Sequence, residues 1–145
     1  MIAEGAAMIG RKLTEGLSVA PQIPPEAMPQ VAAAGFRAVI VNRPDGEEPG
    51  QPSTDVIEAA ARDAGLAFRR LPVTMPSLSA QDAAAFAAAL DDLPGPVLAY
   101  CRSGTRSTAL WALSQAGRRP ADEILAIAAG AGYDLSMLRP RLDPA

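Results

Sequence analysis

The sequence predicts an α/β fold, a three-layer sandwich whose central sheet is mainly parallel and has about four or five strands. Two observations lead to this prediction. Short apolar runs alternate along the chain with alanine-rich segments of helical length, and turn residues separate them. The chain has 145 residues, of which 49% are hydrophobic and 20% charged, so it is long enough to bury a core as a single domain over residues 1–145.

The predicted strands are short runs of aliphatic and aromatic residues, the types that pleated sheets favour. The clearest run is centred on Val39-Ile40-Val41, and another ends at Tyr100, directly before the only cysteine. We place the strands at residues 17–20, 36–42, 67–73 and 96–100.

The predicted helices have capping residues at their ends. Pro25 stands in the first turn of one helix, where its missing N–H costs little, and Gly35 ends that helix. Ser79 precedes another helix, with Asp82 three residues further on, which is the spacing of a capping box. We place the helices at residues 24–34, 53–64, 79–90, 107–116 and 121–130.

The chain contains no histidine and one cysteine, Cys101. The absence of histidine excludes Ser-His-Asp and Cys-His catalysis and most zinc sites. A single cysteine excludes an intramolecular disulfide, so any cysteine chemistry uses one thiol without a histidine base. The formal net charge of −3 argues against a nucleic-acid partner, because neutralising phosphates takes a basic surface. We expect no metal and no cofactor.

Hydropathy gives an expectation about location. The first residues include an acid, Glu4, where a secretory signal peptide has basic residues, and their apolar run is short. The longest uncharged apolar stretches, near residues 83–90 and 124–131, fall far below the roughly 20 residues that a membrane span needs. We therefore expect a cytoplasmic protein that has no membrane partner.

Cys101 stands where a predicted strand ends and a polar loop leads into a helix. Ligands of parallel α/β sheets bind at such strand ends, and backbone N–H groups at a helix N-terminus bind anions and favour a thiolate. The planar fork of Arg106 suits two oxygens of an oxyanion. We predict Cys101 and Arg106 as catalytic residues, and the rest of the loop as substrate-binding residues: Arg102, Ser103, Gly104, Thr105 and Ser107.

The alternative for Cys101 is a structural role, because a lone cysteine is most often a small buried hydrophobe. The loop that follows it, Arg102 to Ser107, contains two arginines and three hydroxyl side chains. Such a loop cannot be buried as a whole, and this favours the functional interpretation.

The run Cys101-Arg102-Ser103-Gly104-Thr105-Arg106-Ser107 resembles the active-site loop of single-domain rhodanese sulfurtransferases. The order of the other segments, with residues 42–47 before one helix and 71–73 before the next, resembles dual-specificity protein tyrosine phosphatases. Both features together resemble the phosphatase-like domain of the beta-lactamase-hydrolase-like family. The resemblance covers about residues 12–142, which we take as the core of the domain, and it implies a dual-specificity phosphatase-like fold.

The sequence departs from the tyrosine phosphatase pattern in three places. Tyr100 stands where that family has histidine, and only four residues separate Cys101 from Arg106 where the family has five. The loop over residues 74–79 contains no acid to protonate a leaving alkoxide.

Two aspartates elsewhere are candidates for the missing acid. Asp82 is better placed to cap its helix, and Asp45 serves equally well as a turn residue before Gly46. The resemblance also suggests that Arg43 and Glu47 line the mouth of the pocket; a solvated loop is the alternative for both.

Sulfur transfer needs no general acid, because sulfite and thiolates leave as anions. We therefore predict a sulfurtransferase that moves sulfane sulfur through a Cys101 persulfide, with a small sulfur donor and acceptor and a sulfur-oxidising enzyme as partner. One alternative is a phosphoester hydrolase with a Cys101 phosphocysteine intermediate. Another is a non-catalytic module that binds a persulfide or an anion.

Overall fold

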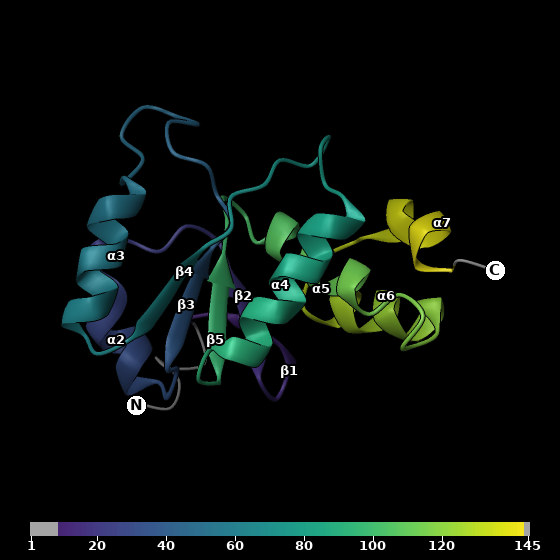
Figure 1. The fold of residues 1–145 in the computed structure, drawn as a ribbon, viewed down its shortest axis with the longest axis horizontal. Coiled ribbons are helices and arrows are strands. Elements are labelled where there is room, and N and C mark those ends of the chain that lie inside the picture. The colour runs from purple at the N-terminus through teal and green to yellow at the C-terminus, as the bar shows by residue number, and fades with distance from the viewer. Residues whose placement is uncertain (1–8, 144–145) are drawn as a thin grey trace.

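The computed structural model describes residues 9–143, which form a five-stranded sheet with helices on both faces (Figure 1). β1 runs antiparallel to β2, and all other neighbouring strands are parallel. The predicted α/β class with a mainly parallel sheet is confirmed. In the order β1-β2-β5-β3-β4 across the sheet, the strands are β1 (Arg11–Thr14), β2 (Leu17–Ala20), β5 (Val97–Tyr100), β3 (Ala38–Val41) and β4 (Ala67–Arg70).

Helices α2 and α3 lie on one side of the sheet in Figure 1, and α4, α5 and α6 lie on the other. Among residues 9–143, no helix is both long enough and apolar enough to cross a membrane. The helices are α2 (Met28–Ala33), α3 (Thr54–Asp63), α4 (Ala80–Asp92), α5 (Thr105–Ser114), α6 (Ala121–Gly130) and α7 (Arg139–Leu142), with single 3-10 turns η1 (Pro25–Ala27) and η2 (Ser136–Leu138).

The core has two layers because successive side chains of a strand point to opposite faces. On β3, Ile40 packs in the cluster that contains Trp111 of α5. Val39, one residue earlier, packs in the cluster that contains Ile57 of α3. β5 is the middle strand of the sheet and is buried along its whole length. Cys101, the next residue, therefore lies between the carboxyl ends of the parallel strands β2 and β3.

The structure differs from the sequence prediction at several element ends. β1 was not predicted, and neither were η2 and α7. β4 ends at Arg70, short of the predicted residue 73; Pro72, which has no N–H to donate to a sheet ladder, follows soon after. α5 begins at Thr105, two residues earlier than predicted, because Gly104 takes the left-handed conformation, with φ +96°, at the N-cap. Arg106 therefore belongs to the first turn of a helix.

The core packing generates the first prediction. Phe86 of α4 is fully buried in the same cluster as Trp111. Phe86→Ala should lower the free energy of unfolding by about 3–5 kcal/mol, because it removes buried surface and leaves a cavity. Denaturant unfolding followed by the fluorescence of Trp111, the one tryptophan of the chain, measures this loss.

Val56, a half-exposed residue of α3, provides the control. Val56→Ala should change the free energy of unfolding by no more than about 0.5 kcal/mol. If Phe86→Ala also stayed within that range, Phe86 would not lie in the core described.

Candidate active site

Cys101 lies directly after β5, at the carboxyl end of the middle strand. Its side chain is fully buried, and Sγ accepts a hydrogen bond of 3.0 Å from the backbone N–H of Gly104. The Cys101 N–H donates to Ala20 O of β2 at 3.3 Å, which extends the ladder by one residue. The sheet therefore holds the backbone of Cys101, and the loop holds its sulfur.

Gly104 makes the tight turn from this loop into α5 possible. Its φ of +96° is a conformation that residues with a side chain rarely adopt. A Cβ atom here would also collide with the hydroxyl oxygen of Tyr133. Thr108 N–H and Oγ1 both donate to Gly104 O, at 3.0 and 2.7 Å, and close the first turn of the helix.

Arg106 is mostly buried, and its guanidinium is fixed by two other loops. Nη1 donates to Val73 O at 3.0 Å and to Glu47 Oε2 at 2.7 Å, and Nη2 donates to Glu47 Oε1 at 2.8 Å. The hydrogen bonds to Glu47 raise the pKa of Arg106; burial opposes this shift, and the nearby Cys101 side chain adds to it. The predicted anion-binding arginine thus lies beside the cysteine with its orientation set.

Glu47 bonds to two arginines at once. Besides its two bonds from Arg106, Oε1 accepts a bond of 2.9 Å from Arg43 Nε. The hydrogen bonds from Arg106, together with the one from Arg43, lower the pKa of Glu47 to about 2 against the opposing effect of burial. Glu47 is therefore ionised at neutral pH, and it orients Arg106 rather than supplying protons.

Arg43 is buried, so its side chain does not belong to a solvated loop. Only 2% of its side chain is exposed. It donates to Glu47, to Gln22 Oε1 at 3.0 Å and to Glu48 Oε1 at 2.8 Å. The solvated-loop alternative is therefore wrong, because three oxygen acceptors satisfy the buried guanidinium. Its position at the mouth of the active-site pocket stays a prediction.

Three predicted substrate-binding residues lie on the outer side of the loop. Arg102 is exposed, and its Nη2 is 3.5 Å from Glu48 Oε2. Ser103 Oγ and Thr105 Oγ1 are 3.0 Å apart, so they hydrogen-bond to each other. These side chains remain available to a bound molecule, and their role is a prediction.

Ser107 is in a different position from the one predicted. Its side chain is fully buried, and Oγ donates to Asn42 Oδ1 at 2.8 Å. Asn42 Nδ2 in turn donates to Leu71 O at 2.9 Å. The Ser107 hydroxyl therefore does not line the anion site; it ties α5 to the segments that follow β3 and β4. Asn42, which directly follows the apolar run of β3, was missed as a residue that supports the site.

Neither aspartate proposed as an acid is free for that role. Asp45 Oδ1 accepts bonds from Thr54 N and Thr54 Oγ1, at 2.8 and 2.7 Å, and these bonds lower the pKa of Asp45. Asp82 and Ser79 form the predicted capping box of α4, with bonds of 3.0 and 3.1 Å. Each carboxylate stabilises the N-terminus of a helix.

Tyr133 contacts the cysteine loop, and it was not predicted from the sequence as a residue of the site. Its hydroxyl donates to Ser103 O at 3.0 Å. The signal that points to it is the pair Gly132-Tyr133 directly after a helix, since a glycine there reverses the chain at the helix end.

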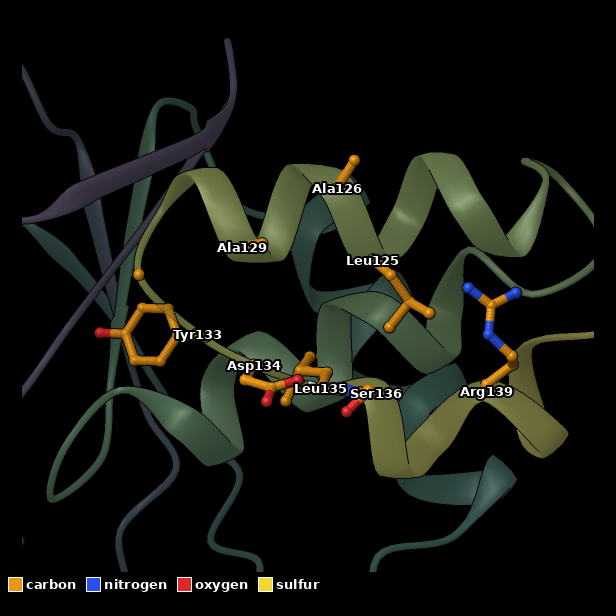
Figure 2. A pocket seen from close by; sticks show the side chains of 9 residues that line it. Leu125, Ala126, Ala129, Tyr133, Asp134, Leu135, Ser136 and Arg139 are labelled. Carbon is orange, nitrogen blue, oxygen red and sulfur yellow. Dashed lines mark hydrogen bonds between the residues drawn. The ribbon is translucent and has the colours of Figure 1, made fainter.

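A hollow of about 530 Å³ lies beside α6 (Figure 2). Leu125 and Ala129 of α6, and Leu135 and Arg139 beyond it, are among the residues that line it, and neither Cys101 nor Arg106 is. Among residues 9–143, no three His, Cys, Asp or Glu side chains come together as metal ligands would.

The sheet order and the cysteine loop define a phosphatase-like α/β domain with its thiol at the end of the middle strand. Residues 10–118 match the family described as Beta-lactamase hydrolase-like protein, phosphatase-like domain, and the chain belongs to that family. The resemblance inferred from the loop and from the order of the segments is thereby confirmed.

Known proteins agree with this assignment. A Beta-lactamase hydrolase-like protein of Xylella fastidiosa is 42% identical over 125 residues, which are 85% of this chain and 29% of the relative. The chain thus spans less than a third of that relative's length. The crystal structure of a candidate phosphatase from Neisseria meningitidis Z2491 is 38% identical, with a TM-score of 0.87, and the match covers 94% of this chain and 98% of that one. The structure named Tk-PTP, 17% identical with a TM-score of 0.69 and 94% of each chain covered, shows the fold alone.

The Glu47 ion pairs generate a prediction about stability and pH. Because the folded-state pKa of Glu47 is about 2, below its ordinary 4.5, the stabilisation is fully present above pH 4.5 and is lost as the pH falls toward 2. Glu47→Gln should lower the free energy of unfolding at pH 7 by about 1–3 kcal/mol.

Denaturant unfolding of both proteins at pH 7, 5 and 3.5 tests this. The difference between wild type and Glu47→Gln should shrink by about 1 kcal/mol from pH 5 to pH 3.5. A difference that stayed constant over this range would mean that the Glu47 charge does not contribute.

Proposed function

We propose that the domain is a sulfurtransferase, in which Cys101 takes a sulfane sulfur from thiosulfate or a small persulfide and carries it as a persulfide. The observation that supports this proposal is the engagement of the carboxylates. Glu47 is ion-paired with Arg106, and Asp45 and Asp82 are bonded at helix N-termini. A reaction whose leaving group needs no proton suits such a site.

The transfer occurs in two steps. The Cys101 thiolate attacks the outer sulfur of thiosulfate, the bond between the two sulfur atoms breaks, and sulfite leaves with the electron pair. An acceptor thiolate or cyanide then attacks the outer sulfur of the persulfide, and the Cys101 thiolate is regenerated. Both leaving groups are stable anions, so a general acid is not required in either step.

The loop suits an anionic sulfur. The Gly104 N–H already donates to Cys101 Sγ, and α5 begins at the next residue, so the positive end of its dipole faces the sulfur. Arg106, oriented by Glu47, adds a fixed positive charge beside it. Preorganised donors of this kind stabilise the negative charge, which is on Sγ in the thiolate and on the outer sulfur in the persulfide.

Phosphoester hydrolysis is the second candidate, and the comparisons favour it. The family is named for its phosphatase-like domain, and the Neisseria meningitidis relative, 38% identical, is named a candidate phosphatase. In this reaction Cys101 attacks phosphorus, the ester oxygen leaves, and water hydrolyses the phosphocysteine. The alkoxide that leaves needs a proton, and the carboxylates of Glu47, Asp45 and Asp82 are engaged in other bonds.

A non-catalytic role in binding a persulfide or an anion is the third candidate, and the absence of turnover would favour it. The sulfur-oxidising partner enzyme belongs to the proposal as well. So does a cytoplasmic location, where the single thiol stays reduced.

A direct comparison of two activities tests the proposal. Transfer of sulfur from thiosulfate to cyanide should exceed hydrolysis of an alkyl phosphate such as phosphoserine by at least about a hundredfold in kcat/KM, because its alkoxide leaving group needs a proton and a missing general acid costs at least that much. Mass spectrometry after thiosulfate treatment should show one added sulfur, about 32 Da, which a thiol acceptor removes.

Cys101→Ser is the control, and it should show neither the added mass nor turnover. Efficient hydrolysis of phosphoesters without a persulfide would overturn sulfur transfer in favour of the phosphatase candidate.

Asp82 yields a separate prediction, with Ser79 as its matched control. Asp82→Ala and Ser79→Ala each break the same capping box, and each should lower the free energy of unfolding by about 1 kcal/mol. Only the first removes a carboxylate. Both variants should keep kcat/KM within about twofold of wild type, whereas loss of a general acid costs about 10²–10⁴-fold. A loss of that size confined to Asp82→Ala would identify Asp82 as the acid.

A further inference from the structure

The end of α6 presents Tyr133 to the cysteine loop through a defined turn. Gly132 has φ +100°, and its N–H donates to Ala129 O at 2.9 Å. The Tyr133 N–H donates to Ala128 O, also at 2.9 Å. These two bonds form the Schellman motif, which fixes the direction in which the chain leaves the helix. The position of the Tyr133 ring therefore follows from α6 and its glycine.

The hydroxyl end of this ring occupies the space against Ser103 and Gly104. It donates to Ser103 O, and it stands where a Cβ atom of Gly104 would be. Cys101 Sγ, bonded to Gly104 N–H, lies directly beneath this stretch of loop and is fully buried. A buried nucleophile needs an opening, and Tyr133 stands beside the loop that covers it.

Tyr133 also borders the hollow beside α6. Figure 2 shows its hydroxyl pointing away from the other labelled side chains that line this hollow. The ring therefore stands between the hollow and the cysteine loop. Burial raises the pKa of Tyr133, and the nearby Cys101 side chain raises it further, so the phenol stays neutral and keeps its bond to Ser103.

We propose that Tyr133 determines the specificity of this site by limiting the width of the group that reaches Cys101 Sγ. Narrow donors and acceptors such as thiosulfate, cyanide and alkyl persulfides pass beside the ring and reach Sγ. Aryl groups are too wide to pass. This inference rests on the proposed role of Cys101 as a nucleophile, and it does not depend on which reaction that nucleophile performs.

Alkylation of Cys101 tests this inference without any turnover. The rates of reaction with iodoacetamide, a narrow reagent, and with N-(1-pyrenyl)maleimide, a wide one, are measured for wild type, Tyr133→Ala and Tyr133→Phe. Tyr133→Ala should raise the ratio of the wide to the narrow rate at least about tenfold, equivalent to about 1.4 kcal/mol in the barrier. Tyr133→Phe keeps the ring, and its ratio should stay within about twofold of wild type.

Further variants separate access from loosening of the fold. General loosening raises both alkylation rates together, whereas a wider opening favours the wide reagent. Tyr133→Leu, which keeps an apolar side chain at the site, should increase the ratio in the same direction as Tyr133→Ala. Met137→Ala, at a 62% exposed residue of η2, should leave both rates unchanged.

An unchanged ratio in both Tyr133→Ala and Tyr133→Leu would overturn the role of Tyr133. A changed ratio in a protein that forms no persulfide would retain this role and refute only the proposed sulfur transfer.

Discussion

The Glu47 carboxylate accepts hydrogen bonds from two arginines that come from different parts of the chain. Arg43 follows β3, and Arg106 lies in the first turn of α5, 59 residues beyond Glu47. Each arginine is largely buried, and a buried charge is stable only when it is paired and hydrogen-bonded. Because Glu47 pairs with both arginines, and Glu48 is a second partner of Arg43, the loop after β3 and the cysteine loop must adopt their positions together. The orientation of the anion-binding guanidinium depends on this bridge.

Further hydrogen bonds connect the loop after β3, the segment after β4 and the cysteine loop. Asn42 joins Ser107 of α5 to Leu71 through its side chain, and its backbone N–H donates to Tyr100 O of β5 at 2.8 Å. Val73 N–H donates to Asn42 O, while Val73 O accepts from Arg106. Three loops thus meet at the carboxyl end of the sheet with their buried polar groups satisfied. These bonds hold the cysteine and the arginine in place with no histidine, which the chain lacks.

The sequence predicted the parts of this site that are local. The loop from Cys101 to Arg106 is one continuous segment at the end of an apolar run, so its chemistry is visible in the residue types. The Glu47–Arg106 pair was not predictable, because charged residues in a turn-rich loop are usually solvated and nothing in the spacing links two such distant positions. Ser107 was placed wrongly because sequence adjacency to Arg106 does not show which side of the helix faces the interior. β1 was missed because Arg11, Lys12 and Thr14 leave it only one apolar residue, and its pairing with β2 supplies the strand conformation.

The basic residues of the two edge strands affect whether two copies of this domain can pair through their sheets. β1 and β4 each carry two neighbouring basic residues, Arg11-Lys12 and Arg69-Arg70. Exposed strand edges invite pairing with another chain, and long cationic side chains are a recognised protection against it. Adding a strand from a second molecule at either edge would strip water from these charges and from their carboxylate partners. The sheet is thereby terminated at both sides, and a crowded solution of the folded domain is protected against edge-to-edge aggregation.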